Sequence, residues 1–317
     1  MHAFYSQLTA DCLLHFTGGQ VPTFLQGQLT CDCLAVSATQ STPGALCSAQ
    51  GRVVTDCRVL QLDENHFALR LAREVRDTTH DTLKKYAMFS RTQISERDDA
   101  WALLGVWGTD AAAALQATVG AVPAGRDSCA RTDDLVACQA DDSGEAFELV
   151  VTVEALPAVL DALSTQARER PEADWQQDEL RRGIIRTTAD LSGDHVPQVL
   201  NYDLAGLLNF RKGCYIGQEV VARLHYRGKS KRRCGVYAAA PGAAVETGAG
   251  LVSPDSDRKV GSVLRAIAAD GKDTLFVALV TVDDSEQPLA VVDTGGDGAL
   301  LQPVALPYSV RGSSEAS

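Results

Sequence analysis

The pattern of apolar and polar positions predicts mostly strands in the first hundred residues, with helices beside them. Short apolar runs that end at Gly, Asp or Asn are typical of strands, and apolar residues at helical spacing among charges are typical of amphipathic helices. The predicted elements are strands at 11–18 and 66–72, two strands within 45–62 that meet near Gln50 and Gly51, a short helix and loop over 21–32, and an amphipathic helix over 73–89.

From residue 101 onward, strand and helix patterns alternate on a compact scale. The predicted elements are strands at 101–108 and 146–153 and helices at 109–120 and 154–170. This order is typical of a ferredoxin-like split βαβ unit, which we expect to end near Pro171. A further helical pattern follows over 175–188.

The sequence after residue 233 consists of short apolar runs divided by Gly, Pro and Asp. The predicted strands lie at 234–240, 250–254, 259–267, 274–280 and 289–293. Several short strands with frequent turn residues predict a small all-β barrel or sandwich. The last seven residues, RGSSEAS, predict a disordered tail.

The length and composition indicate a soluble protein with more than one domain. A chain of 317 residues exceeds what one hydrophobic core usually holds, so we expect two or three domains. Hydrophobic residues make up 45% and charged residues 22%, an ordinary balance for a globular protein. No apolar run is long enough for a membrane span, and the first residues lack the pattern of a secretory signal. We therefore expect a cytoplasmic location and no membrane partner.

The chain is acidic overall but contains one basic segment. The net charge of −12 argues against a surface that binds nucleic acid generally. Between Arg211 and Arg233, however, there are eight Lys or Arg residues and one acid, Glu219. This segment, called the basic island below, is either a solvated face or a surface that attracts anions.

The number and spacing of the cysteines indicate reduced thiols and not a metal site. There are nine, an odd number in a large chain with no sign of secretion. Cys31 and Cys33 form a CxC pair, with Cys47 and Cys57 farther on. These spacings are irregular, whereas a four-cysteine metal site usually shows paired CxxC knuckles. Several of the cysteines lie in predicted strands, where Cys behaves as a small apolar residue.

The stretch KGCYIGQE, residues 212–219, places a thiol directly before a predicted helix. Free N–H groups at a helix start and neighbouring cations both stabilise a thiolate, so Cys214 is a candidate reactive thiol. In the first helical turn, Gln218 and Glu219 could cap the helix or hydrogen-bond a heterocycle. The alternative is a purely structural loop with a buried cysteine. From the residues alone, both interpretations stay open.

The stretch resembles the signature of the YgfZ family of folate-binding proteins, which are relatives of the glycine cleavage T-protein. The matching residues are Lys212, Gly213, Cys214, Tyr215, Gly217, Gln218 and Glu219. The following VARLHYRG is also similar to the family. So are, in the expected order, residues 24–32, 47–53, 83–91 and the segment VPQVLN at 196–201.

The resemblance implies an α+β, T-protein-like fold. Two α+β, ferredoxin-like domains and a small C-terminal β-barrel would surround a central folate cavity. The expected bounds are 1–100 with 178–233 for a discontinuous first domain that carries the signature, 101–177 for an inserted domain, 234–310 for the barrel and 311–317 for the tail.

The resemblance also implies a function. It indicates an accessory protein that binds tetrahydrofolate or a derivative and supports iron–sulfur protein maturation or repair, and thereby tRNA modification. The implied partners are folate, polyglutamylated or not, and iron–sulfur enzymes or assembly proteins. The implied folate-binding residues are Lys212, Gly213, Tyr215, Gly217, Gln218, Glu219, Arg223, Gln198 and Asn201. The basic island would attract the acidic glutamate tail, with direct tRNA contact as the competing interpretation.

Two departures from the T-protein enzymes bear on catalysis. Those enzymes have an Asp-Asp pair after the first hairpin glycine, where this chain has Thr55 and Asp56. They also hold the pterin with a Glu, at a place where this chain has Arg181. The accessory role is therefore favoured over the alternative, a folate-dependent aminomethyl or methyl transferase. The candidate catalytic groups are Cys214 and Asp56.

Overall fold

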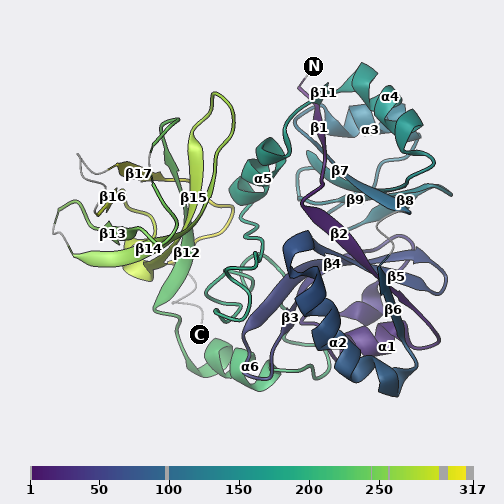
Figure 1. Cartoon of the computed structure of the whole chain (residues 1–317), viewed down its shortest axis with the longest axis horizontal. Helices are drawn as coiled ribbons and strands as arrows, with labels where there is room; N and C mark the ends of the chain where they lie inside the picture. Colours follow the sequence, from purple (N-terminus) through teal and green to yellow (C-terminus); the bar gives the residue numbers. More distant parts are fainter. Residues whose placement is uncertain (1, 97–99, 244, 256–257, 293–298, 312–317) are drawn as a thin grey trace. The chain divides into compact units, whose positions relative to one another are not determined.

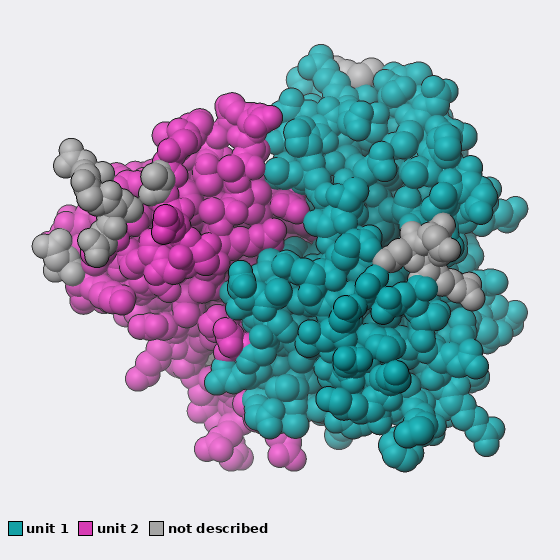
Figure 2. All heavy atoms as spheres, in the orientation of Figure 1, with its two compact units in different colours: residues 1–175, 186–193, 207–218 teal, residues 176–185, 194–206, 219–317 magenta. Residues whose placement is uncertain are grey.

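The structure is a computed structural model of the 317-residue chain, and it describes residues 2–96, 100–243, 245–255, 258–292 and 299–311. The chain divides into two compact units, which Figure 2 shows in different colours. Unit 1 comprises residues 1–175, 186–193 and 207–218, and unit 2 comprises residues 176–185, 194–206 and 219–317. Each unit has its own hydrophobic core.

The first sheet of unit 1 has five antiparallel strands in the order β3-β4-β5-β2-β6. Its strands are β2 (Asp11–Thr17), β3 (Thr42–Cys47), β4 (Val53–Asp63), β5 (His66–Ala72) and β6 (Gln93–Glu96). The helices beside it are α1 (Val21–Gln26) and α2 (Arg76–Ser90), with short 3-10 turns η1 (Cys33–Ala35) and η2 (Arg73–Val75). In β2, Leu14 and Phe16 join the core beneath these helices, while Leu13 points to the other face.

The second sheet of unit 1 has six strands in the order β11-β1-β7-β10-β9-β8. Figure 1 labels β1, β7, β8, β9 and β11 of this sheet. Its strands are β1 (Phe4–Gln7), β7 (Trp101–Trp107), β8 (Cys129–Arg131), β9 (Leu135–Gln139), β10 (Ala146–Thr152) and β11 (Arg168–Glu169). The helices α3 (Ala111–Val119) and α4 (Leu156–Gln166) contribute to a core with one face of this sheet. β1 and β11 are parallel, and the other pairs are antiparallel.

The two sheets of unit 1 share a core between their inner faces. Leu13 and Leu60 come from the five-stranded sheet, and Leu103 and Trp107 come from the six-stranded sheet. Trp175 packs edge-on against Trp107, with ring centroids 5.6 Å apart. Unit 1 therefore has four layers, with helices outside and the two sheets inside.

Unit 2 is built around a closed barrel with the strand order β12-β15-β14-β13-β16-β17. Its strands are β12 (Arg232–Ala239), β13 (Gly250–Val252), β14 (Lys259–Ile267), β15 (Thr274–Thr281), β16 (Leu289–Val291) and β17 (Leu300–Pro303), and η3 spans Val282–Asp284. The helix α6 (Gln218–Arg227) precedes the barrel, and α5 (Glu172–Arg181) begins in unit 1 and continues in unit 2. In a closed barrel, every edge strand is paired with another strand. The sequence predicted a barrel or a sandwich, and the structure has a barrel.

The long predicted elements are confirmed, and the errors lie near chain turns. The helix predicted over 175–188 is α5, which begins at Glu172 and ends at Arg181, before Gly183 with φ 76°. The end of the helix predicted over 154–170 is also wrong, because Arg168 and Glu169 form β11 beside Phe4 and Tyr5. The short strands β1, β6, β8, β9 and β17 were not predicted.

The predicted tail at 311–317 lies outside the described residues except for Arg311. The predicted domain boundaries stay a prediction. In the parts of the chain that the structure describes, no helix is both long enough and apolar enough to cross a membrane.

Candidate functional site

The signature loop, residues 209–217, is joined by main-chain hydrogen bonds to the segment that follows α1. Asn209 donates its N–H to the Thr30 carbonyl at 3.0 Å, and Ile216 donates to the Gly27 carbonyl at 3.3 Å. The Thr30 hydroxyl in turn donates to the Leu207 carbonyl at 2.7 Å. Two segments that resemble the family, 24–32 and 212–217, therefore lie side by side although they are far apart in sequence.

Lys212 holds the loop from inside. Its Nζ donates to the carbonyls of Gln26 and Leu29, each at 2.6 Å, at the end of α1 and just beyond it. A cation suits this place because helix carbonyls are unpaired at the C-terminus. The same ammonium lies 5.3 Å from the centre of the Tyr215 ring. Burial lowers the pKa of Lys212, and the nearby thiols Cys33 and Cys31 act in the opposite direction.

Gly217 fixes the other end of the loop against the turn between β3 and β4. Its φ is +84°, in the left-handed region, and a Cβ there would lie 2.3 Å from the Ser48 carbonyl oxygen. Gly213 differs, since a Cβ at that position would meet nothing within 4 Å. A third family-like segment, 47–53, thus also contacts the loop. Tyr215 between the glycines is buried, and burial raises its pKa.

Cys214 lies on the surface between these two anchors. It is exposed, whereas the other eight cysteines are buried. The structural interpretation of the motif expected a buried cysteine, and that part of it is wrong. The reactivity of the thiol stays a prediction. Among the described residues, no group of three or more His, Cys, Asp or Glu side chains could hold a metal ion.

The signature continues into unit 2 at Glu219, because the division between the units falls after Gln218. Gln218 is the first residue of α6 and is partly exposed. Glu219 and Arg223 are exposed on α6, while Val221 is buried. Tyr226 is 67% exposed, so α6 presents an aromatic ring and cations to solvent.

The two candidate residues of the VPQVLN segment are buried within unit 2. Gln198 donates its amide N–H to the Val221 carbonyl at 2.8 Å, and this contact supports α6. Asn201 has φ 61° and donates its amide to the Cys234 carbonyl at 2.7 Å, at the beginning of the barrel. The Gln198 Oε1 is buried and accepts no hydrogen bond from the described residues. The folate-binding role of both residues stays a prediction.

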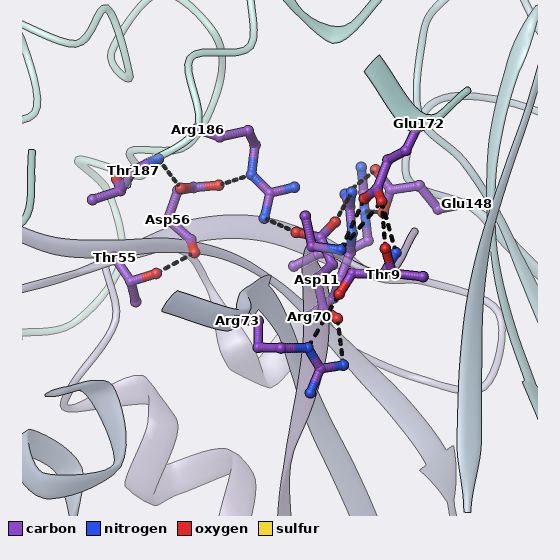
Figure 3. A network of polar contacts seen from close by, with 12 residues as sticks. Thr9, Asp11, Thr55, Asp56, Arg70, Arg73, Glu148, Glu172, Arg186 and Thr187 are labelled. Carbon is purple, nitrogen blue, oxygen red and sulfur yellow. Dashed lines mark hydrogen bonds and ion pairs between the residues drawn. The ribbon is translucent and has the colours of Figure 1, made fainter. Parts of the chain in front are cut away.

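Asp56 lies in the interior of unit 1, away from solvent (Figure 3). Its Oδ1 accepts the Thr187 N–H at 2.6 Å, and its Oδ2 pairs with Nε of Arg186 at 2.7 Å. The Thr55 hydroxyl donates to the main-chain carbonyl of Asp56 at 2.7 Å. Both carboxylate oxygens of Asp56 are thus engaged, and a catalytic role for it stays a prediction.

Asp56 is one end of a chain of alternating charges between the two sheets. Arg186 also contacts Asp11, Arg70 links Asp11 to Glu148, and Arg58 links Glu148 to Asp127 (Figure 3 shows most of these). These side chains are buried or nearly so, and buried charges are tolerated when they are paired. Burial lowers the pKa of Arg58, but Glu148 and Asp127 raise it above its usual value.

The sequence did not predict two residues that support the signature loop region and the charge chain. Gln26 accepts the Cys33 N–H at 2.7 Å through its side chain, and Arg186 neutralises Asp56. The family-like segment at 24–32 pointed to Gln26 only as part of a motif. A usable sign of the charge chain was present in β4, where the charged residues Asp56 and Arg58 lie within a strand of mostly apolar residues.

Comparisons with known proteins decide the family. The sequence profile of the GCVT N-terminal domain matches residues 13–171. A protein of Klebsiella pneumoniae (strain 342), named tRNA-modifying protein YgfZ, is 32% identical over 301 residues, which cover 94% of this chain and 91% of that protein. The protein of the same name from Escherichia coli O7:K1 is 31% identical over 302 residues, with the same coverage. The chain belongs to the YgfZ family.

The fold of this YgfZ-family chain is that of a glycine cleavage T-protein. The glycine cleavage system aminomethyltransferase T from Bartonella henselae superposes with a TM-score of 0.78 at 19% identity, covering 98% of this chain and 87% of that one. The mixed α+β sheets and the closed six-stranded barrel agree with this match. The resemblance and the fold class inferred from the sequence are thereby confirmed.

Proposed function

We propose that this chain is a cytoplasmic, folate-binding accessory protein that supports iron–sulfur protein maturation or repair and, through it, tRNA modification. The observation that carries the proposal is the signature loop, which is anchored at Lys212 and Gly217 and holds an exposed Cys214 between them. Support comes from relatives that are named tRNA-modifying proteins and from a fold shared with an aminomethyltransferase T.

The ligand of the proposed function is tetrahydrofolate or a derivative. Among the signature residues, Lys212, Tyr215 and Gly217 are occupied with holding the loop. Gln218 and Glu219 remain partly or fully exposed and can hydrogen-bond the edge of a pterin through their amide and carboxylate groups. The contacts of the loop anchors Lys212 and Gly217 preorganise these groups, which reduces the entropy lost on binding.

The basic island would interact with the glutamate tail of cellular folates. Arg223, Arg227, Lys229 and Lys231 are exposed in the first part of unit 2, in a chain whose net charge is −12. Carboxylates of a polyglutamate tail pair well with such cations. Contact with tRNA phosphates is the competing role, and it predicts affinity for RNA that falls steeply with salt.

Calorimetric titration with mono- and polyglutamylated tetrahydrofolate tests the ligand. We expect micromolar or tighter binding that strengthens with the number of glutamates. Exchanging Arg223 and Arg227 together for Ala should remove the gain from the longer tail but keep binding of the monoglutamate. Absence of binding for both ligands would overturn the folate proposal.

Complementation tests the role of the thiol. In a strain without its own family member, wild-type protein should restore the activity of iron–sulfur enzymes that modify tRNA, and Cys214→Ala should not. Cys214→Ser, present at equal abundance, separates sulfur chemistry from loss of size. Full restoration by both variants would remove the thiol from the mechanism.

The alternative function is a one-carbon transferase with Asp56 as acid or base. General acid–base catalysis needs a carboxylate within reach of the folate nitrogens. Here both oxygens of Asp56 are occupied by Arg186 and the Thr187 N–H, so the accessory role is favoured. Turnover of tetrahydrofolate with a panel of methylamine donors would reverse this preference.

A further inference from the structure

Two buried thiols face each other in the six-stranded sheet of unit 1. Cys129 on β8 and Cys138 on β9 are register partners in an antiparallel pair. Their Sγ atoms are 2.7 Å apart, and the structure has both as free thiols. Neither residue belongs to the signature loop or to the other segments that resemble the family.

The hydrogen-bond pattern places this pair where a cross-strand disulfide fits. Gln139 donates its N–H to Ser128 at 3.0 Å, and Thr132 donates to Leu135 at 2.9 Å, so these are hydrogen-bonded positions. Because such positions alternate along the ladder, Cys129 and Cys138 form a non-hydrogen-bonded pair, in which Cα atoms are about 4.5 Å apart. A disulfide needs a Cα separation of about 4.4–6.8 Å. The two sulfurs can therefore bond without a change of register.

We propose that Cys129 and Cys138 are an oxidation site, at which a small peroxide converts the two thiols into an intramolecular disulfide between β8 and β9. The site is additional to the proposed function and does not depend on it. The structure has the pair in its reduced form.

The surroundings of the pair shift the pKa values of the two thiols in opposite directions. The hydrogen bond from the Cys138 thiol lowers the pKa of Cys129, as do Ser41 and the Arg58 guanidinium, while burial opposes them. Burial and the hydrogen bond with Cys129 raise the pKa of Cys138. The thiolate is the nucleophile in thiol oxidation, so Cys129 reacts first and Cys138 resolves the product.

The reaction balances with hydrogen peroxide as the oxidant. The Cys129 thiol gives up its proton, the thiolate attacks one peroxide oxygen, the O–O bond breaks, and sulfenic acid and hydroxide form. The hydroxide takes up the proton that Cys129 released and becomes the first water. The Cys138 sulfur then attacks Cys129 Sγ, the S–O bond breaks, and the S–S bond forms. The released hydroxyl takes the Cys138 proton and leaves as water. In total, two thiols lose two electrons, and one peroxide becomes two waters.

The location of the pair suits a small oxidant. Cys129 is 8% exposed and Cys138 is 1% exposed, so a bulky disulfide reagent has poor access. β8 is a three-residue strand at the edge of its sheet, with Cys129 N–H donating to the Thr39 carbonyl. Short edge strands open locally at a low free-energy cost, which gives peroxide a route.

A second thiol pair in unit 1 provides a matched comparison. Cys31 and Cys33 are also buried, with Sγ atoms 3.9 Å apart. The hydrogen bond from Cys31 and burial raise the pKa of Cys33. They are two residues apart in one segment and are not cross-strand partners. We therefore expect this pair to stay reduced when Cys129 and Cys138 oxidise.

The test is native oxidation of the Cys214→Ser protein with hydrogen peroxide, followed by thiol alkylation and peptide mass spectrometry. Trypsin cuts after Arg126, Arg131 and Arg168, so Cys129 and Cys138 fall on the separate peptides 127–131 and 132–168. We expect these peptides to be joined by a link that a reductant removes, with two thiols lost per chain. Loss of the alkylated thiols at Cys31 and Cys33, which share the peptide 1–52, or intact alkylated thiols at both Cys129 and Cys138, would overturn the proposal.

Single variants test the order of the reaction. In Cys138→Ser, sulfenic acid should accumulate at Cys129 and be trapped by dimedone, whereas in Cys129→Ser neither disulfide nor trapped product should form at Cys138. Cys31→Ser is the control and should form the 129–138 link as readily as its parent. Equal trapping at Cys138 in Cys129→Ser would overturn the assigned roles.

Discussion

The signature loop and the charge chain of unit 1 use charged residues in opposite ways. In the loop, a cation binds main-chain carbonyls, and the thiol of the motif is exposed to solvent. In the charge chain, guanidinium and carboxylate groups bind each other, and both carboxylate oxygens of Asp56 are engaged. The comparison teaches that, of the two candidate catalytic groups, the thiol is open to solvent while the acid is already paired inside the unit.

The largest effect should come from breaking the charge chain. Arg58→Leu removes the guanidinium that pairs with Glu148 Oε2 and with Asp127. Removing one partner of a buried pair costs about 3–5 kcal/mol, so urea unfolding should show a loss of that size. Arg76→Leu is the control, because its partners Asp77 and Glu96 are exposed, and it should cost less than about 1 kcal/mol. Equal losses would mean that the chain adds no stability.

The next effect should come from the glycine that anchors the loop. Gly217→Ala puts a Cβ against the Ser48 carbonyl at a left-handed φ, which should cost about 2–3 kcal/mol. Gly213→Ala is matched in sequence and chemistry but has open space, so it should change stability by less than about 0.5 kcal/mol. Thermal unfolding of both variants measures the difference. If Gly213→Ala were the more damaging variant, the anchor would be assigned wrongly.

A smaller effect is expected for the loop cation. Lys212→Met keeps most of the apolar stem but loses two charge-assisted hydrogen bonds to Gln26 and Leu29, with an expected cost of about 1–2 kcal/mol in denaturant unfolding. Lys84→Met, at an exposed position of α2, should have almost no effect. A stable Lys212→Met protein that no longer binds tetrahydrofolate would show instead that the ammonium contacts the ligand.

The smallest effect on stability should accompany the largest effect on function. Cys214→Ala removes an exposed side chain, so the free energy of unfolding should change by less than about 0.5 kcal/mol. Complementation should nevertheless fail. If stability and complementation fell together, the thiol would be part of the architecture of the loop.

The sequence predicted the elements whose burial pattern is local. β2 and β5 alternate or run apolar over seven residues each, and the barrel strands are divided by turn residues. β1 and β11 could not be found in this way, because they are short and pair with each other across more than 160 residues. Pairing at that distance leaves no periodic trace in either segment.

For the candidate site, the sequence located the residues of the signature loop but not their contacts. The motif predicted Lys212 as a ligand contact, and in the structure its ammonium donates to the main-chain carbonyls of Gln26 and Leu29. Every residue has a main-chain carbonyl, so the sequence could not indicate which residues would accept these hydrogen bonds. The motif also singled out Cys214, whose exposure no local pattern could reveal. Arg186 was missed because its partner Asp56 lies 130 positions away in the chain.

The chain passes between the two units five times, after residues 175, 185, 193, 206 and 218. During synthesis the ribosome therefore cannot release a finished unit 1 before residue 218 has emerged, although most of its two sheets are complete by residue 169. Arg186, which neutralises Asp56, arrives in that late portion. In a nascent chain that ends before Arg186, the interior residue Asp56 lacks this guanidinium partner. We expect chaperone protection to matter most at this stage of synthesis.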